Sequence, residues 1–189
     1  MTEKEVLDIF TRHNALLTGH FKLSSGLHSE KYLQCALILQ HPDIAAKLSK
    51  ALSAKFSKDK IGVVIGPALG GITLAYEVAR AIGVRGLFAE RQDGKMVLRR
   101  GFSIEKGEEV LVVEDVVTTG GSTKEAIGVV NALGGKVIGV GSIIDRSSEK
   151  IDFGVPFKSL AVLKVQTFEE KDCPLCKKQV PITKPGSRR

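Results

Sequence analysis

The stretch Val110–Ile127, VLVVEDVVTTGGSTKEAI, decides the fold class of this chain. Four apolar residues lead directly into two adjacent carboxylates, Glu114 and Asp115, and a loop of hydroxyls and glycines follows before a helical pattern begins. A strand, a loop and a helix in this order are typical of one unit of a parallel sheet. Because ligands of such sheets bind beyond the carboxyl ends of the strands, the loop is the first candidate for a binding site.

The same order of strands and helices continues on both sides of this stretch. The sequence predicts strands at 61–68, 84–90, 109–114, 136–146 and 157–165, and helices at 43–56, 71–82 and 122–133. The expected strands are nearly continuous apolar runs, which indicates a sheet that helices cover on both faces. We therefore predict an α/β fold with a central, mostly parallel sheet flanked by helices.

Two segments depart from this alternation. The first residues predict an amphipathic helix at 2–13 with Thr2 as its N-cap, and residues 16–35 predict short strands and turns. The pair Asp93-Gly94 is typical of the turn in a two-residue β-hairpin loop. This hairpin segment carries four basic residues, namely Arg91, Lys95, Arg99 and Arg100.

The composition is that of an ordinary globular protein. Its 189 residues, 43% hydrophobic and 26% charged, suit one domain with a core of its own. No apolar run is long enough for a transmembrane helix, and the first residues lack the apolar region of a signal peptide. Three cysteines, an odd number, do not make a disulfide framework. We expect a cytoplasmic protein without membrane contact.

The basic charge is concentrated at the C-terminus. Residues 171–189 hold six basic residues and one acid, and so carry +5 of the net charge of +7. This tail is either a solvated segment or a surface for an anionic ligand or a nucleic acid. Because the chain has no tryptophan and no zinc-finger or RNA-recognition signature, we expect no nucleic-acid partner.

The two carboxylates and the loop after them suit the two halves of a ribose 5-phosphate. Burying adjacent carboxylates is costly unless donors or a cation meet them, and a vicinal diol or a hydrated Mg²⁺ does so. The backbone N–H groups and hydroxyls of residues 118–122 precede a helix, which favours a bound phosphate. The alternative is an ordinary strand-to-helix turn with Ser122 as N-cap. Neither a Walker loop nor a Rossmann fingerprint occurs in the chain.

The segment VLVVEDVVTTGGST resembles the phosphoribosyl-pyrophosphate signature of the type I phosphoribosyltransferases. Three further segments resemble the orotate phosphoribosyltransferases within that family. GHFKLSSGLHSEKYLQC is similar to their N-terminal hood, IGPALGGITLA to their Gly-Pro-Ala segment, and IIDRSSE places Arg146 where that family binds orotate. An arginine fork suits the carboxylate and planar imide edges of orotate. The tail CPLCKKQVPITKPGSR also resembles that of a subgroup of these enzymes.

The resemblance implies a homodimeric enzyme of pyrimidine biosynthesis that uses orotate and 5-phosphoribosyl 1-diphosphate. It implies Mg²⁺ as cofactor, held mainly by the substrate diphosphate, and no metal ligands of the protein's own. It implies one domain over 1–189, with a hood of residues 14–40 and 166–189 on a core of 41–165. The implied orotate-binding residues are Thr118 and Arg146, and the implied catalytic residues are Arg91, Lys95 and Asp115. The implied diphosphate-substrate ligands are Glu114, Asp115, Val116, Val117, Thr118, Thr119, Gly120, Gly121, Ser122, Arg91 and Lys95.

The chain also departs from the family pattern. Family members carry a lysine at the positions of Ser24 and Gly70 and a histidine in the mobile loop, and this chain has none of the three. Two other functions therefore stay open, a phosphoribosyltransferase for another base and a regulator that binds phosphoribosyl pyrophosphate. Arg146 has an alternative partner in Asp145 or Glu149, and the basic hairpin is alternatively an exposed structural element.

The pair Cys173-x-x-Cys176 is half of a zinc site. Cys35 and His41 are the nearest candidates to complete it, and the alternative is a structural or solvent-exposed tail. We expect the histidines to be surface or packing residues, with His28 as a candidate to line the binding site because it lies in the hood.

Overall fold

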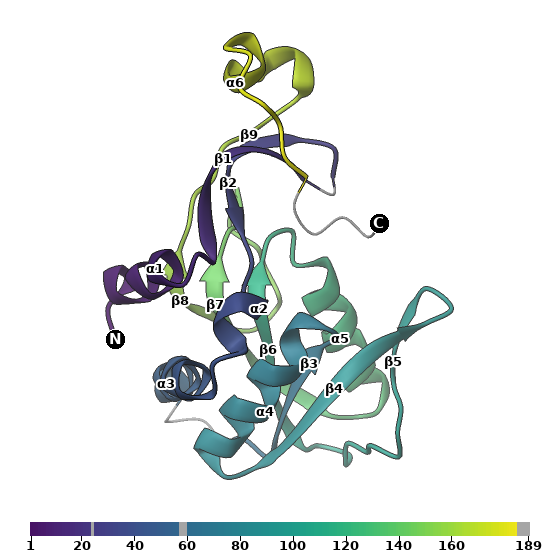
Figure 1. Cartoon of the computed structure of the whole chain (residues 1–189). Helices are drawn as coiled ribbons and strands as arrows, with labels where there is room; N and C mark the ends of the chain where they lie inside the picture. The colour runs from purple at the N-terminus through teal and green to yellow at the C-terminus, as the bar shows by residue number, and fades with distance from the viewer. Residues whose placement is uncertain (24, 57–59, 185–189) are drawn as a thin grey trace.

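The computed structural model describes residues 1–23, 25–56 and 60–184. Ser24, Arg188 and Arg189 therefore lie outside the described residues. Within these ranges the strands form two separate sheets, a six-stranded sheet and a three-stranded one (Figure 1).

The larger sheet confirms the predicted fold class. Its strands lie in the order β5-β4-β3-β6-β7-β8, all neighbours are parallel except β4 and β5, and helices pack on both faces (Figure 1). The strands are β3 (Val63–Pro67), β4 (Arg85–Gln92), β5 (Lys95–Leu98), β6 (Glu109–Val117), β7 (Lys136–Asp145) and β8 (Phe157–Val162).

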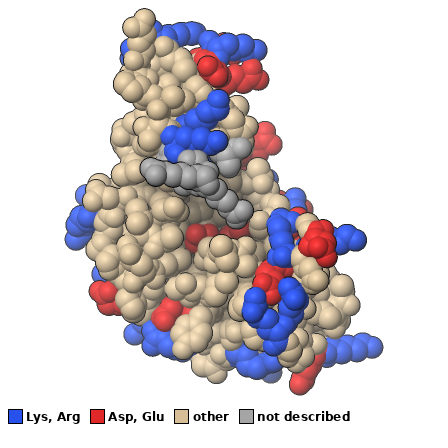
Figure 2. Space-filling view, turned by 45° about the vertical axis from the view of Figure 1, so that its right-hand side comes forward, with Lys and Arg blue, Asp and Glu red and all other residues tan. Residues whose placement is uncertain are grey.

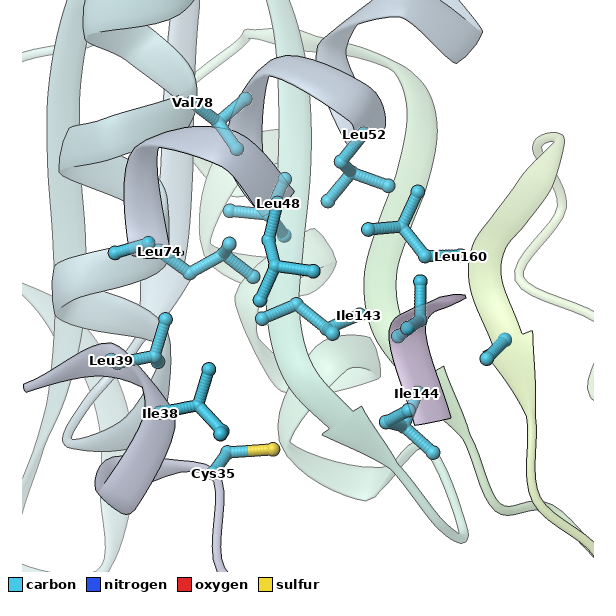
Figure 3. Packing of buried hydrophobic residues seen from close by; sticks show 14 of the residues in the cluster. Cys35, Ile38, Leu39, Leu48, Leu52, Leu74, Val78, Ile143, Ile144 and Leu160 are labelled. Carbon is cyan, nitrogen blue, oxygen red and sulfur yellow. The ribbon is translucent and has the colours of Figure 1, made fainter. Parts of the chain in front are cut away.

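Each face of this sheet has its own apolar core. The helices are α1 (Glu3–Arg12), α2 (Ala36–Leu39), α3 (Pro42–Ser53), α4 (Gly70–Ile82) and α5 (Gly121–Ala132), with a short 3-10 turn η1 (Ala54–Phe56). Figure 3 shows side chains of α3 and α4, such as Leu48 and Leu74, packed against Ile143 of β7. The first four of these helices share that core, and α5 covers the opposite face with Ala126 and Val130.

From Val110 to Val113, the central strand β6 alternates between the two cores. Leu111 and Val113 belong to the core under α3 and α4, whereas Val110 and Val112 belong to the core under α5. Successive side chains of a strand point to opposite faces. The two acids that follow Val113 therefore lie on opposite faces of the sheet.

The smaller sheet forms the hood. It is antiparallel in the order β1-β2-β9, with β1 (Leu16–Lys22), β2 (His28–Leu33) and β9 (Thr167–Phe168). The chain then continues through η2 (Glu170–Asp172) and α6 (Pro174–Lys177), which stand at the end of the hood far from the large sheet (Figure 1). The hood thus combines an early segment with a late one.

Three local predictions are confirmed, one at the start of a helix and two where the chain reverses direction. Thr2 caps α1 in a capping box, accepting from the Glu5 backbone N–H at 3.3 Å while its own N–H donates to the Glu5 carboxylate at 2.7 Å. Asp93 and Gly94 both have positive φ, 52° and 79°, as the predicted two-residue hairpin turn requires. Gly134, with φ 83°, follows α5 at its predicted end.

Two boundaries near the candidate loop differ from prediction. Strand β6 continues through both acids to Val117, because residues 116–117 still pair with β7. Helix α5 begins at Gly121 and its N-cap is Gly120, with no side-chain cap, so Ser122 is not the capping residue. A hydroxyl N-cap is favoured but not required, and glycine tolerates the left-handed φ of 74° found here.

No helix in the described part of the chain is both long and apolar enough to cross a membrane.

Because Gly66 in β3 has no side chain, the sheet packs closely against the start of α4. A Cβ at this position would lie 2.4 Å from the carbonyl oxygen of Gly71. We expect Gly66→Ala to lower the free energy of unfolding by about 1–3 kcal/mol, the usual cost of overpacking, as measured by urea denaturation. Gly128→Ala in α5 is the control, because no atom lies within 4 Å of the added methyl. An unchanged stability of Gly66→Ala would contradict this close packing.

Candidate active site

A pocket of about 390 Å³ lies where the carboxyl ends of β6 and β7 meet the hood. Three of the predicted site residues, Asp115, Thr118 and Arg146, line it together. Figure 2 shows a hollow between the hood and the main body with acidic side chains at its floor. The pocket is lined by Lys22, Leu23, Tyr32, Leu33, Gln34, Cys35, Asp115, Val116, Thr118 and Arg146.

A second pocket of about 320 Å³ adjoins the first at Asp115. Its other walls come from α2, from the turn before α4 and from the first turns of α4, including Gly70 and Thr73. Because both pockets share Asp115, this carboxylate stands between two spaces that a ligand with two ends can occupy.

Asp115 is a carboxylate with no ion-pair partner in the described part of the chain. Burial raises its pKa, and its carboxylate accepts one hydrogen bond, from the Val116 backbone N–H at 2.9 Å. No lysine or arginine among the described residues forms an ion pair with it. The carboxylate therefore keeps acceptor positions for the hydroxyls of a ligand or for a ligand-bound cation.

Gly70 explains one departure from the family pattern. A Cβ at this position would lie 2.6 Å from Oδ1 of Asp115. The Cβ of a lysine at position 70 would overlap the Asp115 carboxylate. With the carboxylate where it is, position 70 requires glycine.

Glu114 is turned to the other face of β6. The hydroxyl of Thr123, a buried residue in the first turn of α5, donates to the Glu114 carboxylate. Burial raises the pKa of Glu114 to about 7, with a further contribution from the charge of Asp115, against the opposing hydrogen bond from Thr123. The two adjacent acids thus occupy different environments.

The loop between β6 and α5 has the form of an anion site. Gly120 adopts φ 74°, and a Cβ there would lie 2.9 Å from the ring of Phe153, so glycine is needed for both conformation and space. The first backbone N–H groups of a helix have no partner within the helix. At α5 these groups follow directly after Thr118 and Thr119, whose side chains are exposed.

Arg146 brings a positive charge into the pocket without a matching acid. Its backbone N–H donates to the carbonyl of Val117 at 2.8 Å, which places it directly after β7. The alternative pairing with Asp145 is not observed, because that carboxylate accepts from the N–H and hydroxyl of Ser147 at 2.9 and 2.6 Å. In the described part of the chain the guanidinium has no ion-pair partner, and burial lowers its pKa. A planar anion is the ligand that such a fork binds.

Lys22 is a pocket residue that is not among the predicted site residues. It lines the pocket from the end of β1 and makes a long contact of 3.9 Å with Glu170. The signal for it in the sequence is its place in FKLSSG, two residues before the position where the family carries lysine. Tyr32 and Gln34 of the hood are further pocket residues without a sequence signal of their own.

The basic hairpin does not reach this pocket within one chain. The guanidinium of Arg91 pairs with Glu125 of α5 at 2.5 Å and donates to the carbonyl of Gly94 at 3.0 Å. Lys95 lines a separate surface depression against α5. Figure 1 shows the β4–β5 hairpin projecting away from the hood, and Met96 and Leu98 pack against the core under α5.

The expected zinc partners of the cysteine pair are wrong. Cys35 lines the pocket beside Arg146, and the ring of His41 lies 5.0 Å from that of His13. His20 and His28 are buried rather than at the surface, and their nitrogens lie close to the sulfurs of Cys173 and Cys176. The expectation that His28 lines the binding site is also wrong, because it points toward this cluster.

The pKa of Glu114 predicts a pH effect on stability. The folded state holds a proton that the unfolded state releases between about pH 4.5 and 7, so stability falls as the pH rises through this window. The unchanged protein should therefore lose unfolding free energy between pH 5 and 8. Glu114→Gln should make that loss smaller by roughly 2 kcal/mol. Urea denaturation at the two pH values measures it, with exposed Glu149→Gln as control. Equal slopes for Glu114→Gln and the unchanged chain would refute the shift.

Comparisons with known proteins agree with this geometry. The family model for the phosphoribosyl transferase domain matches residues 36–159. The orotate phosphoribosyltransferase of Caldanaerobacter subterraneus is 61% identical over 189 residues, and that of Thermoanaerobacter sp. is 59% identical, with 100% of both chains covered in each case.

Solved structures show the same fold. The orotate phosphoribosyltransferase of Aeropyrum pernix matches with a TM-score of 0.68 at 27% identity, over 84% of this chain and 93% of that one. The Mycobacterium tuberculosis enzyme in complex with inorganic phosphate matches with a TM-score of 0.71 at 25% identity, over 85% and 95%. The chain therefore belongs to the orotate phosphoribosyltransferases, within the type I phosphoribosyltransferase family.

Proposed function

We propose that this protein is a cytoplasmic enzyme of pyrimidine nucleotide synthesis. It transfers ribose 5-phosphate from 5-phosphoribosyl 1-diphosphate to orotate and gives orotidine 5′-monophosphate and diphosphate. The single observation that carries the proposal is Arg146, a partly buried guanidinium without an acid partner in the described chain. It lies in one pocket with Asp115 and Thr118, so a planar anion and a sugar phosphate meet there.

The chemistry is a displacement at C1 of the ribose. The bond from orotate N1 to C1 forms, the bond from C1 to the diphosphate oxygen breaks with its electron pair, and the N1 proton is released. Charge develops on the ribose ring as at other glycosyl centres. The protein contributes position and charge balance rather than a nucleophile.

The residues divide the substrate between them. Asp115 accepts hydrogen bonds from the ribose hydroxyls, whereas Glu114 lies on the other face of β6 and accepts from Thr123. Residues 118–122 hold the 5′-phosphate with backbone N–H groups and hydroxyls, to which the helix end adds roughly 0.3–1 kcal/mol. Thr118, Arg146 and Lys22 surround the base, and Arg146 binds the orotate carboxylate.

The residues present fit a Mg²⁺-bound diphosphate. The pKa of the Asp115 carboxyl is raised by burial and no cation of the described chain compensates its charge, so a cation carried by the substrate would be stabilised there. When bound, Mg²⁺ neutralises the charge that develops on the departing diphosphate. It would be held mainly by the diphosphate, with Asp115 beside it.

The hairpin residues act in a neighbouring site. We propose a homodimer in which Arg91 and Lys95 of one subunit meet the diphosphate in the other, because neither residue lines the Asp115 pocket of its own chain. We further propose that residues 1–189 act as one domain, with a hood of residues 14–40 and 166–189 over a core of 41–165.

Replacing Arg146 tests the choice of base. We expect Arg146→Ala to raise KM for orotate about 10- to 100-fold, since hydrogen bonds to charged groups contribute about 1.5–3 kcal/mol. KM for 5-phosphoribosyl 1-diphosphate should change little. The measurement is the loss of orotate absorbance with both substrates and Mg²⁺, run beside uracil and purine bases.

Arg80→Ala is the matched control, because Arg80 is exposed and pairs with Glu77 away from the pocket. If Arg146→Ala saturates with orotate as the unchanged protein does, or if another base is used in preference, the assignment to orotate fails.

Mixing two impaired variants, assayed at an orotate concentration well below the KM of Arg146→Ala, tests the shared site. In a dimer of Arg91→Ala and Arg146→Ala chains, a hairpin that acts in trans leaves one site with both arginines intact. We expect co-refolded or co-expressed chains to recover roughly a quarter of the wild-type activity, as random pairing in a symmetric dimer dictates. A hairpin that acts in its own subunit gives no recovery, and that result would contradict the proposal.

A further inference from the structure

Four metal-binding side chains converge at the end of the hood, away from the pocket. His20 lies on β1, His28 on β2, Cys173 directly before α6 and Cys176 within it. The ligand atoms of these four residues all lie within 4.8 Å of one another. Figure 1 shows α6 at the tip of the hood, beyond β9. We propose that these four residues form a structural zinc site that attaches the C-terminal segment to the hood.

Four of the six distances between the ligand atoms are close to those of a coordination tetrahedron. Zn–S bonds of about 2.3 Å and Zn–N bonds of about 2.0–2.1 Å place sulfur and nitrogen ligands about 3.5 Å apart, and two nitrogens about 3.3 Å apart. Nε2 of His20 lies 3.5 and 3.7 Å from the sulfurs of Cys173 and Cys176. Nδ1 of His28 lies 3.2 Å from the Cys176 sulfur and 3.1 Å from Nε2 of His20.

The hydrogen bonding of His20 prepares it as a ligand. Its Nδ1 lies 2.7 Å from the carbonyl oxygen of Val180, which accepts only, so Nδ1 carries the proton. Nε2 is then the lone-pair nitrogen, and it faces the two sulfurs and His28. A metal-bound histidine typically donates its other N–H to a carbonyl or carboxylate in this way.

The burial of the cluster also favours a metal. His20, His28 and Cys173 are buried, and all three cysteines of the chain are free thiols. The polar contacts of the His28 ring are made by Nδ1 within the cluster, because Nε2 is buried with no hydrogen-bond partner in the described chain. Two thiolates and two imidazoles in a tetrahedron select Zn²⁺ over the oxygen-preferring Mg²⁺.

The described part of the C-terminal segment buries little of its own surface. Among residues 166–184, Cys173 is the one buried side chain, and α6 is only four residues long. The segment's contacts with the hood include two residue pairs between β9 and β2, an exposed 3.9 Å ion pair, the hydrogen bond between His20 and Val180, and backbone hydrogen bonds at Thr183. Segments that bury so little apolar surface commonly depend on a metal or a disulfide.

The position of the site has a consequence for the pocket. His20 and His28 lie on the two strands that carry Lys22 and Tyr32 into the pocket. All four coordination positions are filled by protein, which is the mark of a structural rather than a catalytic zinc site. Zinc would therefore brace the hood without taking part in the reaction.

Metal analysis of the full-length protein tests the site without any substrate. Protein purified without chelator should contain about one zinc per chain by mass spectrometry of the metal. A Cys173→Ser/Cys176→Ser variant and a His28→Asn variant should contain less than about a tenth of that. Cys35→Ser and His13→Asn are matched controls outside the cluster and should keep the full zinc content.

Two measurements on the unchanged protein, Co²⁺ binding and amide hydrogen exchange, test the site even if a variant fails to fold. The unchanged protein is first freed of zinc, its thiols are reduced, and Co²⁺ is added. It should then show the visible absorption of tetrahedral thiolate-bound cobalt. Stripping should speed amide exchange in β1, β2 and residues 167–184 more than about tenfold, and leave β3 and β6 unchanged. Absence of zinc with no cobalt spectrum, a Cys173–Cys176 disulfide in the purified protein, or zinc retained by the double cysteine variant would each overturn the proposal.

Discussion

The position of one carboxylate, Asp115, is the constraint on which the rest of the site depends. Strand β6 is buried on both faces between two apolar cores, and its alternation sends Glu114 toward α5 and Asp115 toward α4. Without a cation from the described chain, the Asp115 carboxylate is costly to bury. The structure keeps it close to open pocket space on either side, where a ligand can satisfy it.

The surroundings of Asp115 follow from that arrangement. Glycine at position 70 leaves room for the carboxylate, and glycine at position 120 lets the chain turn from β6 into α5 under Phe153. Arg146 leaves the neighbouring strand at the same edge of the sheet because β6 and β7 are parallel. The pocket thus combines a negative floor with a positive wall, which suits a substrate pair made of a polyol phosphate and a planar anion.

The hood is built differently from the core below it. The large sheet is stabilised by two apolar clusters, whereas residues 166–184 bury almost no side chain and follow the two hood strands at their edge. Polar and metal-binding groups therefore have to supply order where apolar burial does not. This division separates the large sheet, which carries Asp115 and Arg146, from the hood, which adds Lys22 and Tyr32 to the pocket.

The sequence by itself determined the local structure and the type of chemistry. Apolar runs, turn residues and the Thr2 cap are local signals with local causes, so the strand and helix order, the Asp93-Gly94 hairpin and the loop between β6 and α5 follow from them. The pocket around Asp115, Thr118 and Arg146 was also predictable, because parallel strands end at a common edge.

Only the tertiary structure decided which distant residues meet. The extension of β6 through both acids depends on pairing with β7, and the partners of Cys173 and Cys176 depend on how the tail folds back on β1 and β2. Lys22 enters the pocket because the hood hairpin leans over the sheet. Such contacts join residues far apart in the chain and are set by packing, so no local pattern in the sequence specifies them.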